Sequence, residues 1–195
     1  MEDKRIADIT EETGGAPDIR PLFWALIRIG FSVNIGFTGV LLIDILPAFY
    51  GYWQISCVLD SIPDYDRPRA LKPVLFLAAL LSLIGWFPGI ASAIPAAVDT
   101  MLSLAAMACN TLIYYHVLGL LIFLSERAGR YDLAENGRRF RYVYLIPYAV
   151  LTLVGIYQGG VQNFWYMLLL IAEMGLPIYA ANCDKALFAN QSQVS

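Results

Sequence analysis

Long apolar runs separated by short polar stretches organise this chain. Residues 72–90, 96–124, 140–158 and 161–182 are nearly free of charge, and the stretch between the second and third runs, residues 125–139, is strongly basic. Runs of about 18 or more apolar residues are typical of membrane-spanning helices. The pattern therefore predicts four helices that each cross a bilayer.

The preceding region, residues 22–62, has two interpretations. In a six-span arrangement, residues 22–43 cross once, the sequence DILPAF turns, and residues 48–62 cross back. In a five-span arrangement, one helix runs from Phe23 to Pro47, and the following YGYWQISCVLDSI lies along the membrane surface. A span normally needs about 20 residues, so the short second helix counts against six spans.

The distribution of basic residues favours six spans. Cytoplasmic loops are enriched in Lys and Arg, and this bias sets the orientation of membrane proteins. With six spans, all 13 Lys and Arg residues fall on the same side as both termini. With five spans, Lys4, Arg5, Arg20 and Arg28 lie on the opposite side from the others. We therefore predict six spans in a bacterial cytoplasmic membrane, with both termini cytoplasmic and five spans as the alternative.

Composition supports the same class of protein. Hydrophobic residues make up 58% of the 195 residues and charged residues only 15%. A typical soluble domain has about 45–50% and about 25%. The predicted fold is an all-α polytopic transmembrane bundle that forms a single domain, residues 21–188. A polar acidic cytoplasmic tail, residues 1–20, and a short polar tail, residues 189–195, flank this domain.

The sequence IDILPAFYGYWQIS, followed by RPRALKPVLFLAALLSLI, resembles a pattern in uncharacterised polytopic membrane proteins of clostridial-type bacteria. In those proteins one helix ends in Asp-Ile-Leu-Pro, Phe and Gly-Tyr open the next helix, and Lys-Pro starts another. The match covers residues 43–84 of this chain. The resemblance implies the helical hairpin of the six-span arrangement, and it implies no particular activity.

Glu173 is the clearest candidate for a functional residue. It lies near the middle of the last apolar run, four residues before Pro177. A charged side chain at the centre of a bilayer costs about 2.5–3.5 kcal/mol on insertion scales, so it is rarely present without a role. The proline also leaves the carbonyl of Glu173 without its usual backbone partner. One hypothesis is a carboxylate that binds a proton or a cation. The other is a side chain, protonated or hydrogen-bonded to a neighbouring helix, that serves packing.

The second apolar run carries a polar stripe. Asp99, Ser103, Asn110 and Tyr114 fall on one helix face at about 100° per residue. Asn110 lies at a depth similar to that expected for Glu173, which allows a hydrogen bond between them. The alternative is that the stripe only joins helices, through hydrogen bonds of about 0.6 kcal/mol each. For Asp99 the helix dipole alone is a sufficient explanation, because carboxylates are favourable in a first turn.

Six spans also bring acidic and aromatic residues together on the outer side. Ring faces and carboxylates attract cations, so this side suits a small cationic or amphipathic molecule. An aromatic belt at the membrane surface is the alternative explanation. The candidate ligand-binding residues of this side are Asp44, Tyr50, Trp53, Trp86, Asp99, Trp165 and Tyr166.

The sequence contains no recognisable catalytic or metal-binding pattern. His116 is the only histidine, and Cys57, Cys109 and Cys183 lack zinc spacing. Nucleotide-binding loops and nucleic-acid-binding modules are also missing. We predict no catalytic residue, no metal, no cofactor and no nucleic-acid partner. In the lipid bilayer, the chain is predicted to be a transport-type protein for a small molecule or ion, with an outward-facing pocket. The alternative is a non-catalytic accessory or assembly protein that binds other membrane subunits.

Overall fold

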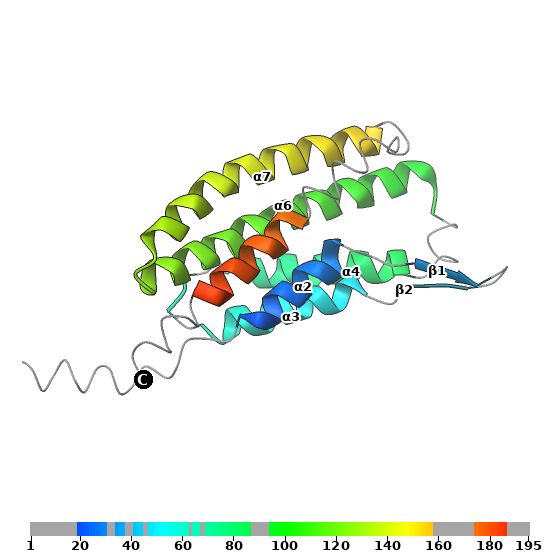
Figure 1. The fold of residues 1–195 in the computed structure, drawn as a ribbon. Helices are drawn as coiled ribbons and strands as arrows, with labels where there is room; N and C mark the ends of the chain where they lie inside the picture. The colour runs from blue at the N-terminus through cyan, green and yellow to red at the C-terminus, as the bar shows by residue number, and fades with distance from the viewer. Residues whose placement is uncertain are drawn as a thin grey trace, which may run out of the picture.

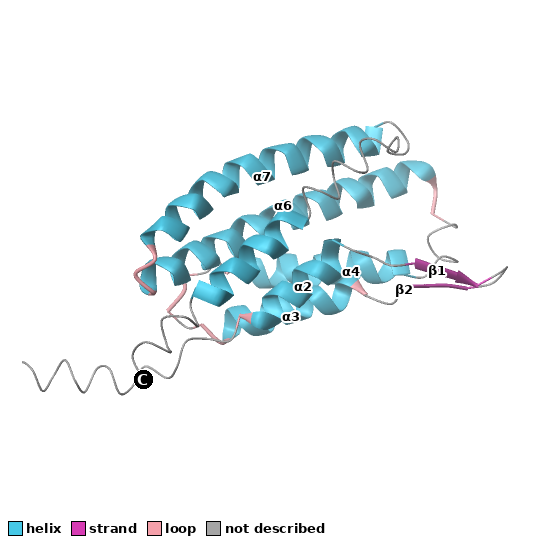
Figure 2. Ribbon diagram, viewed as in Figure 1, coloured by secondary structure: helices cyan, strands magenta, loops and turns pink. Residues whose placement is uncertain are grey.

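The computed structural model describes residues 19–30, 34–37, 41–44, 47–62, 64–66, 69–86, 94–157 and 174–186. Within these residues the chain forms six helices and one two-stranded antiparallel sheet (Figure 2). In chain order the elements are α2 Arg20–Gly30, β1 Asn34–Phe37, β2 Leu41–Asp44, α3 Ala48–Asp60, α4 Leu71–Trp86, α6 Ala96–Arg127, α7 Tyr131–Tyr157 and a helix over residues 174–186. The predicted helical class is confirmed, and the small sheet is an addition to it.

The helices lie side by side and run in alternating directions (Figure 1). α2 packs on α3, α3 on α4, α4 on α6, and α6 on α7. The 174–186 helix joins this bundle through Cys183, which contacts Ser125 of α6, and through Tyr179, which stacks on Phe140 of α7. The β1–β2 hairpin projects from one end of the bundle, which we call the hairpin end (Figure 1).

Local sequence sets the bounds of α6. Pro95 precedes the helix with φ −60° and ψ 141°, and proline has no N–H to leave unpaired at a helix start. At the other end, Gly129 adopts φ 72°. Its N–H donates to the Glu126 carbonyl, and the Arg130 N–H donates to the Ser125 carbonyl. This is the Schellman arrangement, in which a left-handed glycine ends a helix. The resulting turn is short, so α7 folds back directly along α6.

α7 begins earlier than the sequence analysis predicts. The predicted span starts at residue 140, whereas α7 starts at Tyr131 and includes much of the basic stretch. Asp132 lies in the first turn, where a carboxylate is favourable. Glu135 and Arg139 form an ion pair at 3.2 Å with the i,i+4 spacing that supports a helix. The basic stretch is therefore mostly a helical extension, and only its first residues form a turn.

The first predicted span is wrong as a continuous helix. Instead of one helix over residues 22–43, α2 ends at Gly30, and β1 and β2 pair with Asn34 opposite Asp44. The sequence after Gly30, FSVNIGFTGVLLID, contains many β-branched residues and two glycines. β-Branched residues favour strands, and glycine weakens a helix by about 1 kcal/mol. The next two predictions, helices over 48–62 and 72–90, correspond to α3 and α4.

Among the described residues, one helix has both the length and the apolar composition needed to cross a membrane. This helix is α6, whose 32 residues extend about 48 Å at 1.5 Å per residue. The apolar core of a bilayer is about 30 Å thick. α4 is also apolar but shorter, and α2 and α3 have only 11 and 13 residues. Helix length therefore does not confirm the polytopic bundle, and six spans stay a prediction.

Charged side chains gather at the end of the bundle opposite the hairpin end. Here α3 ends, α4 begins and α6 turns into α7, and we call residues 60–72 and 126–141 the charged end. Lys72 pairs with Asp60 at 3.0 Å, and Arg127 pairs with Asp64 at 2.6 Å. The first ion pair joins the end of α3 to the start of α4, and the second joins the α3–α4 loop to the end of α6.

Arg28 is an exception to the predicted grouping of all basic residues on one side. It lies in the last turn of α2, next to β1, and therefore toward the hairpin end. Its guanidinium donates a hydrogen bond to Gln54 and lies 4.9 Å from the centre of the Tyr50 ring. Polar and aromatic partners on α3 thus hold this cation at the α2–α3 contact.

Candidate functional site: a seam of tyrosines

α7 carries a row of aromatic side chains on its inner face. Phe140, Tyr144 and Tyr148 recur at every fourth residue, which places them on one side of a helix. Their rings stack, with centroids 5.4 Å apart for Phe140–Tyr144 and 6.0 Å apart for Tyr144–Tyr148. Both tyrosines are at most 4% exposed. The row therefore faces the interior of the bundle.

Rings from two other helices extend this row. Tyr114 of α6 meets Tyr144 and Tyr148 edge-on, with centroids 5.9 and 5.2 Å away. Tyr179 of the 174–186 helix stacks on Phe140 at 5.4 Å. Such pairs contribute about 0.5–1.5 kcal/mol each beyond their buried area. The row thus joins three helices through ring contacts.

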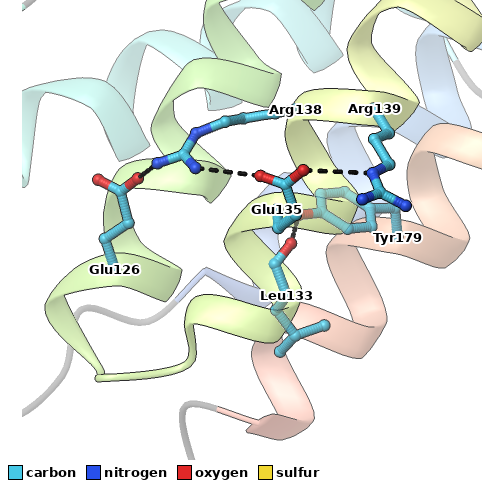
Figure 3. A network of polar contacts seen from close by, with 6 residues as sticks. All are labelled: Glu126, Leu133, Glu135, Arg138, Arg139 and Tyr179. Atoms are coloured by element: carbon cyan, nitrogen blue, oxygen red, sulfur yellow. Dashed lines mark hydrogen bonds and ion pairs between the residues drawn. The ribbon is translucent and has the colours of Figure 1, made fainter.

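Gly137 allows the 174–186 helix to approach α7. A Cβ atom at this position would lie 2.2 Å from the hydroxyl oxygen of Tyr179. Without that atom, the hydroxyl passes α7 and donates to the Leu133 carbonyl at 2.9 Å (Figure 3). Small residues at helix contacts permit this kind of close approach.

Asn110 connects the row to α3. It lies one turn before Tyr114 on the same face of α6, as the predicted polar stripe requires. The hydroxyl of Tyr52 on α3 donates a hydrogen bond of 2.6 Å to Oδ1 of Asn110. Tyr52 is only 4% exposed, so this hydrogen bond lies within the bundle. Glu173, the predicted partner of Asn110, lies outside the described residues.

We call these side chains the tyrosine seam. The seam crosses the bundle from α3 through α6 and α7 to the 174–186 helix. It places phenol hydroxyls and one amide in a buried position without an ionised side chain among them. Ring faces attract cations, and hydroxyl and amide oxygens accept hydrogen bonds. The seam is therefore chemically suited to a small molecule with a positive group. Its members are Tyr52, Asn110, Tyr114, Phe140, Tyr144, Tyr148 and Tyr179.

Of the predicted outer residues, Tyr50 and Trp53 come together. Both lie on α3 with ring centroids 5.2 Å apart, and they are 39% and 57% exposed. Asp99 is exposed in the first turn of α6, about 17 Å along the helix from Asn110. Asp99 and Asn110 therefore do not share one site, and the position of Asp99 agrees with the helix-dipole explanation.

For two of the remaining predicted site residues, Asp44 and Trp86, the structure describes the position in the backbone. Asp44 is the last residue of β2, and Trp86 is the last residue of α4. Trp165, Tyr166 and Glu173 lie outside the described residues. The outward-facing pocket that these residues would line stays a prediction.

A separate polar network joins α6 to α7 at the charged end (Figure 3). Arg138 pairs with Glu126 of α6 and with Glu135 of α7, and Arg139 also pairs with Glu135. The Arg138 and Arg139 side chains are 54% and 75% exposed. Exposed ion pairs contribute only about 0–1 kcal/mol each. The network is thus exposed to solvent, and it links the end of α6 to the first turns of α7.

No group of three or more His, Cys, Asp or Glu side chains in the described ranges is placed to hold a metal ion. Neither a protein-family model, nor a curated protein, nor a solved structure matches this chain. Function is therefore inferred from the tyrosine seam and from the helix surfaces.

The sequence analysis missed most of the seam. The spacing of Phe140, Tyr144 and Tyr148 is the pattern that indicates an aromatic helix face, and it would have identified the α7 row. Tyr52 has no such local pattern, because its partner Asn110 lies 58 residues away in the sequence. Only the tertiary arrangement of α3 and α6 brings that pair together.

Proposed function

We propose that this chain is a small integral membrane protein of transport type, which binds a small cationic or amphipathic molecule at the tyrosine seam. The observation that supports this proposal is the burial of five tyrosine rings, one of which donates to the partly buried Asn110 amide, between helices with exposed apolar side chains. The membrane placement and the ligand site are separate parts of the proposal, and each has its own test.

Exposed apolar side chains support the membrane placement. On the outer face of α7, Tyr142, Val143 and Ile146 are 67%, 69% and 61% exposed. On α4, Phe76 and Leu77 are 73% and 43% exposed. Soluble monomers rarely expose contiguous apolar patches of more than a few hundred Å². In a bilayer these side chains contact lipid tails instead of water.

The placement of charge supports the same conclusion. Between Asp99 and Glu126, α6 has no charged residue, and α7 has none from Tyr142 to its end at Tyr157. Charged residues inside a bilayer are costly, whereas they are favourable at its surfaces. α6 therefore has a central segment without charged residues between two carboxylates. Such a segment is suited to the interior of a bilayer.

Two single-cysteine variants test whether α6 crosses the membrane. Ala97 and Tyr131 are exposed and lie beyond opposite ends of the apolar segment of α6. In a background without the three native cysteines, Ala97→Cys and Tyr131→Cys should react with an impermeant thiol reagent from opposite sides. Reaction of both cysteines from the same side would overturn the crossing.

The chemistry of the seam supports a cationic group on the ligand. A cation over the face of a tyrosine is stabilised by about 0.5–2 kcal/mol, with the larger value for desolvated sites. Tyr114 and Tyr148 present rings next to each other, and Asn110 adds an amide one turn away. The described part of the seam holds no Lys or Arg side chain that would repel such a ligand.

A thermal-shift experiment tests the ligand site. The full chain in detergent is incubated with tetramethylammonium or benzyltrimethylammonium and, in parallel, with neutral analogues of the same size. We expect the cations, but not the neutral analogues, to raise Tm. Tyr114→Leu should abolish the shift because the ring is lost, and Tyr114→Phe should keep most of it. Tyr142→Leu, at a 67% exposed position on α7, is the matched control.

An accessory or assembly role is the second candidate function. The same exposed face of α7, around Val143 and Ile146, offers an apolar surface to another membrane subunit. If no cation raises Tm, while a photo-crosslinker at Ile146 captures a distinct membrane protein, the accessory role replaces the transport role. A crosslinker at Ala108, on the exposed face of α6, controls for random lipid-phase encounters.

A further inference from the structure

Gly119 opens a gap in the surface of α6. A Cβ atom there would lie 2.5 Å from Nη2 of Arg141 and 2.8 Å from the hydroxyl oxygen of Tyr65. Because this atom is missing, two side chains from other elements reach the helix backbone. The Tyr65 hydroxyl donates to the His116 carbonyl at 3.0 Å, and Arg141 Nη2 donates to the Tyr115 carbonyl at 3.1 Å.

Arg141 is held in a defined orientation at this gap. Its guanidinium carbon lies 3.9 Å above the centre of the Tyr115 ring, which adds a cation–π contact to the hydrogen bond. Its Nε is buried and has no hydrogen-bond partner. Within the described residues, no carboxylate forms an ion pair with Arg141. This half-buried cation therefore has a fixed orientation and no carboxylate partner among the described residues.

The neighbouring arginines differ in this respect. Arg127, Arg130, Arg138 and Arg139 each pair with a carboxylate of the charged end. Arg127 ends α6, Arg130 lies in the turn, and Arg138 and Arg139 lie on α7 with side chains that are 54% and 75% exposed. Arg141 lies further along α7 than any of them. The basic stretch thus contains paired arginines, and Arg141, two residues beyond it, has no acidic partner among the described residues.

The position of Arg141 along α7 corresponds to a membrane surface. It is the last charged residue of α7, and exposed apolar side chains such as Tyr142 and Val143 follow it directly. Tyr65, from the loop between α3 and α4, reaches the same level of α6. Burial raises the pKa of the Tyr65 phenol, so this group is a neutral hydroxyl at physiological pH. Lipid phosphates lie at the level where such polar loops meet apolar helices.

We propose that Arg141, with Tyr65 and Tyr115, forms a binding site for a phosphate group at the surface of the membrane, and that an anionic phospholipid occupies it. Guanidinium groups bind phosphate through charge-assisted hydrogen bonds. The lipid headgroup supplies a negative charge, and none of the described carboxylates supplies one through an ion pair with Arg141. The inference rests on the membrane placement proposed above, and it does not depend on the ligand at the tyrosine seam.

The test compares lipids with the full chain in detergent micelles. Phosphatidylglycerol and phosphatidylcholine are titrated in parallel, and bound lipid is counted by native mass spectrometry. We expect preferential retention of phosphatidylglycerol. Arg141→Gln should weaken its apparent affinity about fivefold, which corresponds to about 1 kcal/mol for one basic residue near an anionic surface. Arg139→Gln removes the same charge from α7 and is the matched control, with an expected change below twofold.

A second experiment distinguishes a bound lipid from a bound soluble anion. Inorganic phosphate is added to the chain in neutral micelles, and Tm is measured. A phosphate-dependent shift that disappears in Arg141→Gln would support the anion site with a soluble occupant and overturn the lipid assignment. No shift, together with retention of phosphatidylglycerol that depends on Arg141, supports the lipid.

Two outcomes overturn the proposal itself. The first is equal retention of the two lipids by the unmodified chain, a result that stands even if Arg141→Gln does not fold. The second is an equal loss of phosphatidylglycerol in Arg141→Gln and Arg139→Gln. Failure of the cysteine-labelling test on α6 would instead remove the membrane placement, so the two failures are distinguishable.

Discussion

The α2–α3 pair and the α6–α7 pair are both antiparallel, yet they are held together by different contacts. α2 and α3 pack through aliphatic side chains and through Gly51, where a Cβ atom would lie 2.7 Å from the Ala25 carbonyl oxygen. α6 and α7 pack through the rings of Tyr114, Tyr144 and Tyr148. The first pair thus meets closely at a glycine backbone, whereas the second pair meets through aromatic rings.

The two pairs also differ in the groups at their contacts. The α2–α3 contact holds Arg28, which donates to Gln54 and lies over the ring of Tyr50. The α6–α7 contact holds the buried rings of Tyr114, Tyr144 and Tyr148. These buried rings are the reason that the proposed ligand site includes the α6–α7 pair and not the α2–α3 pair.

The largest effect is expected from added volume at the α2–α3 contact. Gly51→Val should destabilise the protein by about 3 kcal/mol, because the new atoms collide with the backbone of α2 at Ala25. Unfolding in mixed micelles of increasing SDS content measures the change. Ala108→Val adds similar volume on the exposed face of α6 and should change stability little. Equal stability of Gly51→Val and the unmodified chain would contradict close backbone contact.

A smaller effect is expected from removing one ring that joins α7 to the 174–186 helix. Phe140→Leu keeps an apolar side chain but removes the stacking on Tyr144 and Tyr179. The expected loss is about 1–2 kcal/mol. The same unfolding titration measures it, and Tyr142→Leu at an exposed position of α7 is the control. If both variants lose the same stability, ring stacking does not hold these helices together.

The hydrogen bond between Tyr52 and Asn110, which links the two helix pairs, should contribute still less to the free energy of unfolding. Tyr52→Phe removes the hydroxyl that donates to Asn110 across α3 and α6. Interhelical hydrogen bonds in membranes average about 0.6 kcal/mol and reach about 1.7 kcal/mol. A double-mutant cycle with Asn110→Ala isolates this value, and Tyr50→Phe at a more exposed position is the control. A coupling energy near zero would show that the two side chains do not stabilise each other.

The smallest effect concerns the turn that joins α6 to α7. A hydrogen bond from Arg130 lowers the pKa of the Asp132 carboxyl. A lowered pKa in the folded state means that this contribution to stability is present above the ordinary pKa of about 4 and disappears as the pH falls through the lowered value. NMR titration of the Asp132 carboxyl carbon measures the pKa. In Arg130→Gln it should return toward the ordinary value, and an unchanged titration would exclude the pair.

Much of the fold could be predicted because local sequence determines where helices begin and end. Pro95 and the α4 stretch beginning LKP mark starts that the structure confirms to within one residue. The continuous span over residues 22–43 was wrong because hydrophobicity alone does not separate a helix from a strand. β-Branched residues and glycines after Gly30 change the backbone preference without changing the hydropathy.

The candidate site was less accessible to prediction. Asn110 was identified because an amide in an apolar run is conspicuous in the sequence. Tyr144 and Tyr148 were overlooked because tyrosines near a helix end are also typical of a membrane surface. Which explanation holds depends on the face that the helix presents to its neighbours. That face is decided by packing between segments far apart in the chain.

The sequence by itself determined the helical class, several helix boundaries and the gathering of most basic residues at one end of the bundle. These features follow from local backbone preference and from the cost of placing charge among apolar residues. Only the tertiary structure decided that Tyr52 meets Asn110, that Tyr179 passes Gly137, and that Arg141 rests on α6 beside Gly119. Each of these contacts joins residues that no local interaction relates, and each exists because two helices come close enough for their side chains to meet.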